Sequence, residues 1–462
     1  MGDGAASHPA PRYNGEDRIS ALPNDLLGDI ITRLPFMDAA RTAAFASHWR
    51  QIWRSTPLVL RDADAHLSEA THVATVARAL ADHPGPFHTV SLFGCRAASL
   101  DLELPEWPRL LTTKRIENLC FHNKQTQLQT TLSPLPADIL CCGSLQSLSL
   151  AFWKIPDDLL LAANAFPNLR KLGLVRNDMS DQYIHRLLVS SPILEYLGLV
   201  LNGKPERVHV CSQSLRCLFL GLSKVEEFTV VDTPLLERIM FFKPPYGGTD
   251  CVRFRIASAP KLRVIGYLEP RIHKLQIGGS IIKPDTMASP GTVVPGVEVL
   301  ALKVNFGVFW EVKMLASFLR CFPNVGTLHI EVLSVQPDPS VAAHEPTGEQ
   351  HARFWKEASP VESLRLHIRS LFIHKFQGDQ NEFEFLKYVA LNARELRALL
   401  VVSPDKKIAL ALADEVNEMA NKLDRPLFQP WTARGLLESP RVRNVLISAK
   451  VPFLGVRDPF RW

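Results

Sequence analysis

Near its start the chain carries two short stretches whose apolar residues recur at the spacing of amphipathic helices. In the first stretch the apolar residues stand at offsets 0, 1, 4, 5 and 8, so they share one helical face. These residues are Leu26, Leu27, Ile30, Ile31 and Leu34. Asn24 or Asp25 is the candidate N-cap, and Pro35 is expected to end the helix.

The second stretch is predicted to be a helix capped by Asp38, with a tryptophan-bearing segment behind it. Its packed face would hold Ala40, Ala44, Phe45 and Trp49, and Trp53 follows about one turn later. A unit of roughly 40 residues with so little apolar surface is marginal alone and leans on a partner or a following domain. The alternative is that the first helix simply packs on its own domain.

Further along, the pattern apolar-x-x-apolar-x-apolar repeats. Strict all-leucine copies occupy residues 145–150, 169–174, 194–199 and 215–220, with central leucines 24, 25 and 21 residues apart. Chance gives about one strict copy in a chain of this composition. Leucine-rich repeats have periods of about 20–29 residues, so the pattern predicts such an array.

Looser copies extend the array at residues 87–92, 116–121, 236–241, 262–267, 297–302, 325–330 and 361–366. Helical segments such as residues 181–189 lie between the strands, so each unit is expected to be strand, turn and helix. One unit cannot bury its own apolar face, so neighbours stack. The predicted fold class is an α/β leucine-rich-repeat solenoid, with a parallel sheet on the concave face and helices on the convex face, behind an all-α N-terminal module. Residues 265–300 are predicted to hold a loop insertion.

The positions between the apolar residues of each strand are expected to point outward on the concave face. They form a mixed polar and aromatic surface able to bind a protein. The candidate substrate-binding residues are Arg170, Glu195, Arg216, Phe219 and Arg238.

Residues 17–60 resemble an F-box, in the form found at the head of plant F-box/leucine-rich-repeat proteins. The resemblance rests on Leu-Pro-x-Asp-Leu-Leu from Leu22, Leu-Pro from Leu34, Asp-Ala-x-Arg-Thr from Asp38 and Trp-Arg-x-x-Trp from Trp49. It implies docking on a Skp-type adaptor that links the chain to a cullin–RING ubiquitin ligase. By the same resemblance, the residues that would face the adaptor or support that surface are Leu22, Pro23, Leu26, Leu27, Ile30, Leu34, Pro35, Trp49 and Trp53.

One turn departs from the family pattern. Family members usually carry Ser-Arg-Arg or Ser-Lys-Arg before the first tryptophan, whereas this chain has Ala46, Ser47 and His48. Two basic side chains are therefore missing, which bears on adaptor affinity. The alternative function is a protein-interaction scaffold with a degenerate F-box that no longer joins a ligase.

A helix-like run from Glu384 resembles the C-terminal FBD region of plant F-box proteins of this type. The core of the resemblance is Lys387, Tyr388, Asn392, Ala393, Arg394 and Leu396. The predicted organisation is a disordered leader (1–16), the F-box (17–60), a helical linker (61–86) with a helix at 70–81, irregular leucine-rich repeats (87–370), an FBD-like region (371–424) with a helix at 408–423, and a tail of uncertain order (425–462).

Composition and motifs exclude several function classes. The net charge of +5 is too small to argue for nucleic acid, and no apolar run is long enough for a signal peptide or a membrane span. The eight cysteines are scattered and are expected to be reduced, buried thiols. The chain contains none of the phosphate-loop, dinucleotide, serine-hydrolase or zinc-protease motifs, so no catalytic residue, cofactor or metal site is predicted. The expected compartment is the cytoplasm, the nucleus or both.

Overall fold

The computed structural model describes residues 17–61, 69–93, 107–123, 131–136, 139–140, 142–155, 165–201, 205–222, 225–242, 251–333, 348–357, 361–403, 429–430 and 444–448. The predicted leader, the predicted helix at 408–423 and most of the tail lie outside these residues. The chain divides into two compact units, Met1–Ser149 and Leu150–Trp462. Each unit is described by itself.

The first unit begins with three short helices and continues into a parallel sheet. Its elements are α1 (Asn24–Arg33), α2 (Phe36–Thr42), α3 (Ser47–Ser55), β1 (Leu58–Arg61), α4 (Glu69–Asp82), β2 (Phe87–Leu92), α6 (Trp107–Thr113) and β3 (Asn118–His122), and β4 (Ser147–Ala151) crosses the division between the units. Strands β1, β2 and β3 pair in parallel, with Leu60 opposite Val90 and Val90 opposite Leu119. The helix predicted at 70–81 is confirmed as α4.

The starts of the first two helices differ from the prediction. Pro23 is the N-cap of α1 and Pro35 is the N-cap of α2, and neither helix has a side-chain cap from Asn24, Asp25 or Asp38. Proline fits a helix start because its missing N–H has no partner there in any case. Trp49 belongs to the separate helix α3, so it is not on the packed face of α2.

The second unit contains a long parallel sheet with one strand from each repeat. Its strands are β5 (Lys171–Val175), β6 (Tyr196–Leu201), β8 (Cys217–Leu222), β10 (Arg238–Phe241), β12 (Val264–Leu268), β15 (Val299–Val304), β16 (Thr327–Val332), β17 (Ser370–His374) and β18 (Ala398–Val402), followed by β20 (Asn444–Ser448) and β19 (Gln429–Pro430). One buried aliphatic residue per strand stands in register across the sheet: Leu172, Leu197, Leu218, Ile239, Ile265, Leu300, Leu328, Leu371 and Leu399. This register confirms the α/β leucine-rich-repeat solenoid.

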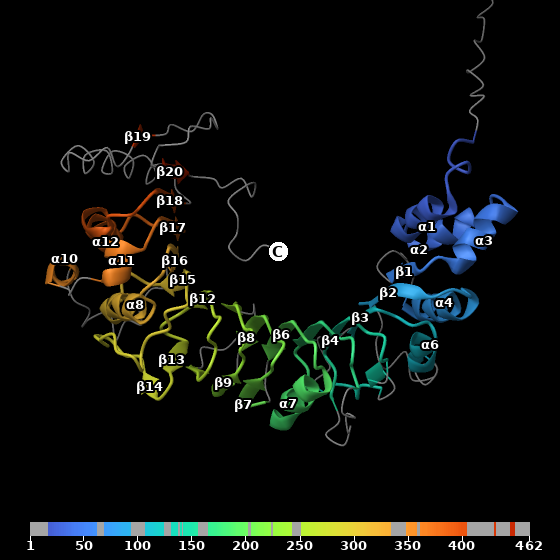
Figure 1. Cartoon of the computed structure of the whole chain (residues 1–462), viewed down its shortest axis with the longest axis horizontal. Coiled ribbons are helices and arrows are strands. Elements are labelled where there is room, and N and C mark those ends of the chain that lie inside the picture. The colour runs from blue at the N-terminus through green and yellow to red at the C-terminus, as the bar shows by residue number, and fades with distance from the viewer. Residues whose placement is uncertain are drawn as a thin grey trace, which may run out of the picture. The chain divides into compact units, whose positions relative to one another are not determined.

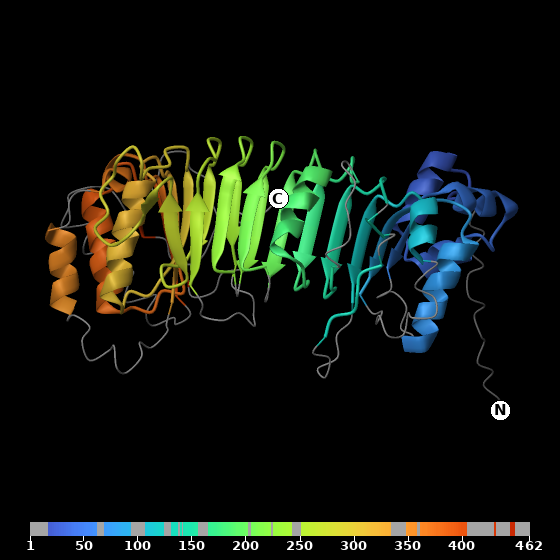
Figure 2. The ribbon, with the colours of Figure 1, turned by 90° about the horizontal axis from the view of Figure 1, so that it is seen from below.

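In some repeats a helix leads the chain back towards the next strand of the long sheet. In the middle of the unit this return is made by strands of a second, mostly parallel sheet. The helices are α7 (Asp181–Ser190), α8 (Phe309–Cys321), α10 (Gly348–Glu357), α11 (Glu362–Leu366) and α12 (Gln380–Asn392). The second sheet contains β7 (Arg207–Cys211), β9 (Glu227–Asp232), β11 (Val252–Ile256), β13 (His273–Ile277) and β14 (Ser280–Ile281). Figure 1 places β7 and β9 across the core from β6 and β8, and Figure 2 shows the second sheet between the green helix α7 and the yellow helix α8.

The expectation of a helix in every unit is therefore wrong for these repeats. Their return segments alternate exposed and buried residues, as in β7, where Val208 and Val210 are buried between exposed neighbours. That period of two fits a strand rather than a helix. The stretch predicted to be a loop insertion also contains β13 and β14, which pair antiparallel around a Gly278-Gly279 turn.

Two predictions near the C-terminus are also corrected. Residues 361–366 were expected to be a strand, but Glu362–Leu366 is helix α11 and the strand of that repeat is β17. Val361 and Leu364 are both buried at a helical spacing of three, whereas Leu366 is exposed. The helix-like run from Glu384 begins earlier, as α12, and its second half is the strand β18.

Candidate functional site

Helix α1 divides its apolar residues between two environments. Leu27 and Ile31 are completely buried, while Leu26 is 49% exposed. Ile30 and Leu34 are half-buried. The spacing of four residues therefore gives α1 an inner stripe that packs in the module and an outer stripe that is open to a partner.

The outer stripe is part of a larger exposed apolar set in the N-terminal module, residues 17–61. Among the described residues of this module, the exposed large apolar side chains are Ile19, Leu26, Met37 and Phe45. Pro23 and Pro35 are also exposed, and Leu22 is half-buried. The sequence analysis missed Ile19 and Met37 and placed Phe45 on a packed face. Phe45 is 75% exposed because it lies in the turn after α2, which the hydrophobic pattern had continued as a helix.

The two tryptophans of the predicted site hold the module together. Trp49 is 7% exposed, and its Nε1 donates a hydrogen bond of 2.6 Å to Ser20 Oγ, which fixes the segment before α1 against α3. The ring of Trp53 meets the edge of the His83 ring at a centroid distance of 4.6 Å, and His83 in turn packs on Phe87 at 5.1 Å. Trp49 and Trp53 therefore contribute to packing rather than to the exposed apolar set.

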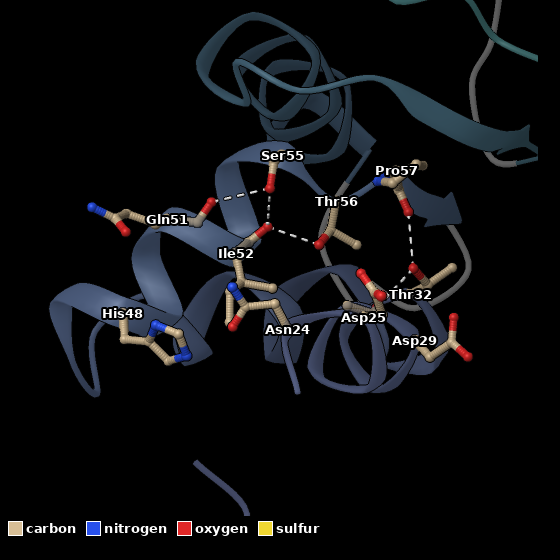
Figure 3. Close-up of a pocket in the computed structure, with 11 residues that line it drawn as sticks. Asn24, Asp25, Asp29, Thr32, His48, Gln51, Ile52, Ser55, Thr56 and Pro57 are labelled. Atoms are coloured by element: carbon tan, nitrogen blue, oxygen red, sulfur yellow. Dashed lines mark hydrogen bonds between the residues drawn. The ribbon is translucent and has the colours of Figure 1, made fainter. Parts of the chain in front are cut away.

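A polar cleft of about 460 Å³ opens between α1 and α3 in the same module (Figure 3). The side chains that line it include Asp25, Asp29, His48 and Gln51. Thr32 also lines the cleft, and its single hydroxyl hydrogen is shared between the carbonyl oxygens of Gly28 and Pro57, at 3.0 and 3.2 Å from Oγ1. Ile52 and Pro57 are the apolar side chains of its lining, so the cleft is mainly polar and differs from the exposed apolar set.

The turn whose sequence differs from the family pattern lies on the surface of the module. Ala46, Ser47 and His48 are all exposed, and Ala46 is the N-cap of α3 without a side-chain cap. His48 faces the polar cleft near Asn24 (Figure 3). Replacing basic residues here changes the charge of the surface and leaves the packing of α1, α2 and α3 unaffected.

In the repeats, the sheet face turned away from the helices and from the second sheet, here called the open face, carries an aromatic pair. Phe219 is 41% exposed and stacks on Phe242, with ring centroids 4.6 Å apart and an interplanar angle of 27°. The Phe242 ring lies over Gly221, where a Cβ would come within 2.5 Å of the ring. Gly173 and Gly198 stand in register with Phe219 on the neighbouring strands. The pair therefore stands beside nearly bare backbone.

Three of the five predicted substrate-binding residues are engaged with ion-pair partners. They lie in a strand-start row, defined as the residues that precede each strand and are joined by backbone hydrogen bonds. Arg170 pairs with Glu195 at 2.5 Å, and Arg216 pairs with Glu237 at 2.7 Å. Phe219 and the half-buried Arg238 instead stand on the strands themselves. The structure thus brings Arg170 together with Glu195 and separates both from Phe219.

No group of three metal-ligating side chains occurs in the described ranges, and none of the helices found there is long and apolar enough to cross a membrane. The thiols of Cys142, Cys217 and Cys321 are buried as expected, but those of Cys211 and Cys251 are exposed. Burial raises the pKa of Cys217 and of Cys321 to about 12, so these thiols stay protonated.

Three family models match the chain in the order of its structural parts. The F-box domain model matches residues 19–61, the model described as "FBD-associated F-box protein At5g56370, LRR repeats" matches residues 104–330, and the FBD model matches residues 356–400. The chain belongs to the plant F-box/FBD/leucine-rich-repeat family. Its N-terminal module is the F-box, and α11, β17 and α12 lie within the FBD, which ends inside β18.

Relatives from Arabidopsis thaliana show the same combination. F-box/FBD/LRR-repeat protein At5g22660 is 29% identical over 46% of this chain and 47% of its own length, so that match spans about half of the relative. F-box/LRR-repeat protein At3g26922 is 28% identical over 54% of this chain and 74% of its own length. F-box/FBD/LRR-repeat protein At4g00160 is 22% identical over 89% of this chain and 92% of its own length.

Proposed function

We propose that this chain is the substrate-recognition subunit of a Skp–cullin–F-box ubiquitin ligase. The F-box docks on a Skp-type adaptor, the repeats hold a protein substrate, and catalysis belongs to other subunits of the ligase. The chain itself contributes proximity and orientation. The observation that carries the proposal is the exposed outer stripe of α1, in which Leu26 is 49% exposed beside the buried Leu27.

The proposal is tested by binding of the full chain to a purified plant Skp-type adaptor. Leu26→Glu places a charge in the proposed apolar interface and is expected to weaken binding by about tenfold or more. Leu26 is half-exposed, so the F-box stays folded in this variant. The matched control is Val189→Glu, which changes a 57% exposed residue on α7 of the repeats and is expected to leave binding unchanged.

If wild type fails to bind the adaptor, or Leu26→Glu binds as well as wild type, the proposed docking surface on α1 is wrong.

The second candidate function is a scaffold outside any ligase. It is favoured by the turn at Ala46, Ser47 and His48, which differs from the family pattern. Those side chains are exposed, so the change Ser47→Lys with His48→Arg restores the family's charge without repacking. Adaptor binding that appears only in this double variant would support the scaffold for the natural chain.

The proposed substrate surface is the open face around the Phe219–Phe242 pair. An exposed aromatic ring beside bare backbone is typical of the anchors that dominate protein interfaces. Arg238 stands on the strand beside Phe219, and register places Cys217 and Arg238 opposite each other. This surface binds a protein through an apolar centre and a charged margin.

A further inference from the structure

In the first unit, a thiol and an imidazole lie side by side on the sheet face that turns away from the core. On β3, Leu119 and Phe121 are buried, and the half-buried Cys120 and His122 alternate with them. On the neighbouring strand β4, the half-buried Ser149 alternates with buried leucines in the same way. Since side chains along a strand point alternately to opposite faces, Cys120, His122 and Ser149 share one face of the sheet.

The three side chains are in contact through one atom of the imidazole. His122 Nε2 lies 3.2 Å from Cys120 Sγ and 2.9 Å from Ser149 Oγ. In the tautomer that carries its proton on Nδ1, Nε2 has one lone pair, which the thiol S–H and the hydroxyl O–H share. The same atom is therefore placed to accept the thiol proton when the sulfur reacts, which is the role of a general base.

Neighbouring side chains fix the orientation of the His122 ring. The Phe93 ring meets it edge to face, with centroids 4.9 Å apart and an interplanar angle of 87°. The Ser149 hydroxyl contacts Nε2 from the strand on the other side. Phe93 is 47% exposed, so the group lies at the surface of the sheet, within reach of a small molecule. A base that is held in one orientation keeps its nitrogen on the thiol.

The other cysteines that the structure describes are placed differently. Cys211 and Cys251 are exposed, and no imidazole lies within hydrogen-bond distance of either thiol in the described ranges. Cys142 is 1% exposed, and its Sγ lies 3.2 Å from Thr112 Oγ1. Among the described cysteines, Cys120 is therefore the one that combines partial exposure with a neighbouring base.

We propose that Cys120 is a reactive thiol activated by His122, and that hydrogen peroxide oxidises it. His122 takes the thiol proton while the sulfur attacks one peroxide oxygen. The S–O bond forms as the O–O bond breaks, and the proton passes to the leaving hydroxide, so the products are a sulfenic acid and water. The sulfur is oxidised by two electrons and the peroxide is reduced by two.

The oxidation is reversible and changes the sheet face locally. Two molecules of a small thiol such as glutathione return the sulfenic acid to the thiol, with release of water and a small disulfide. Cys120 stands opposite Ser91 in the sheet, so the added oxygen lies among small polar side chains. The reaction is independent of adaptor docking by the F-box.

The first test measures alkylation of the full chain by iodoacetamide at pH 7, followed for each cysteine by mass spectrometry. Cys120 is expected to react about tenfold faster than Cys211 and Cys251, although it is less exposed than either. The variant His122→Gln removes the base and is expected to slow Cys120 by about tenfold, without changing the rates of the two exposed thiols. Cys142 is buried in the same unit and stays unlabelled as long as that unit is folded.

Two further variants show whether the effect belongs to this imidazole. His88→Gln is the matched control, because it removes a half-buried imidazole from β2 that pairs with Glu117 instead of a thiol. It is expected to leave the Cys120 rate unchanged. Ser149→Ala removes the hydroxyl that shares Nε2 and keeps the base, so Cys120 should react at least as fast as in wild type.

The second test treats the reduced full chain with hydrogen peroxide and traps sulfenic acid with dimedone. Dimedone is expected to label Cys120 in wild type, about tenfold less in His122→Gln, and not at all when glutathione is added after the peroxide. The proposal is overturned if wild-type Cys120 is alkylated no faster than Cys211, a comparison that depends on no variant. It is also overturned if His122→Gln leaves the Cys120 rate unchanged, or if dimedone fails to label Cys120. Adaptor binding measured in parallel reports on the proposed ligase function separately.

Discussion

At the scale of single residues, the first unit depends on a histidine that follows the F-box and must stay neutral. His83 is 1% exposed and lies between Trp53 and Phe87. Burial, with a smaller contribution from the nearby positive charge of Lys114, lowers its pKa to about 4. The Lys114 ammonium donates to the carbonyl oxygen of His83, so it cannot be displaced without breaking that contact. Protonation of His83 would therefore place two cations together in an apolar aromatic stack.

The consequence is a pH dependence with a definite sign. A histidine whose folded pKa lies below its unfolded value of 6.5 binds its proton more readily in the unfolded chain, so stability falls as the pH falls. Between pH 7 and pH 5, this one residue should lower the stability of the first unit by roughly 2 kcal/mol. His83→Phe keeps the aromatic stack and removes the titration. Denaturant unfolding of both full chains at the two pH values measures the difference.

The comparison controls for the other histidines. Burial also lowers the pKa of His273 and of His329 to about 3, and both residues are in the repeats. They titrate equally in wild type and in His83→Phe, so the difference in pH dependence isolates His83. An identical slope in the two proteins would show that His83 is protonated at no energetic cost to the fold.

At the scale of elements, two helices of the repeats are tied to the preceding turn by a buried glutamate. On α8, Glu311 Oε2 accepts the N–H of Asn305 at 2.8 Å. On α12, Glu382 Oε2 accepts the N–H groups of Gln377 and Gly378 at 2.9 and 3.0 Å. Burial raises the pKa of Glu382 to about 7, although these hydrogen bonds oppose the shift. The carboxyl group therefore acts mainly as an acceptor rather than as a charge.

This role predicts different effects for two substitutions of Glu382. Glu382→Gln keeps an oxygen acceptor without a charge and is expected to change stability by less than about 1 kcal/mol. Glu382→Ala leaves two N–H groups without a partner in a buried turn and is expected to lower stability by roughly 2–3 kcal/mol. Thermal unfolding of the full chain measures both. Equal losses in the two variants would mean that the charge of Glu382, rather than its hydrogen bonding, stabilises the turn.

The elements that sequence predicted well are those whose pattern repeats. The central apolar residue of each copy, such as Leu172 or Leu197, stands in register in the sheet because each strand must present the same buried row. The second sheet was not predicted, because a stretch as short as Arg207–Cys211 does not show by itself whether the segment between two strands of the long sheet is a strand or a helix. The exception at residues 361–366 satisfied the strand pattern by chance and is a helix.

The candidate site was less predictable than the fold, because exposure depends on partners distant in sequence. The periodicity of α1 grouped Leu26 and Leu27 on one face, but contacts with α3 and β1 bury only Leu27. Likewise, Arg170 and Glu195 resembled free surface residues until the register showed that they pair. The alternation of Arg and Glu was present in the sequence, but it appears only when successive repeats are aligned on their central residues.

At the scale of the whole molecule, the two units have separate cores, and this division gives a prediction for Leu27. Leu27 is completely buried beneath the outer stripe of α1, in the first unit. Leu27→Glu would bury an unpaired charge, which costs several kcal/mol, so the F-box should unfold. Adaptor binding would be lost through unfolding, whereas Leu26→Glu should lose it with the module intact.

The repeats are expected to survive Leu27→Glu, because their sheet register from β5 to β18 is made within the second unit. Hydrogen exchange of the full chain, read by peptide, distinguishes the two regions. Protection should disappear over residues 17–61 and persist over β5 to β18. Loss of protection throughout the repeats would show that the F-box and the solenoid fold as one cooperative unit.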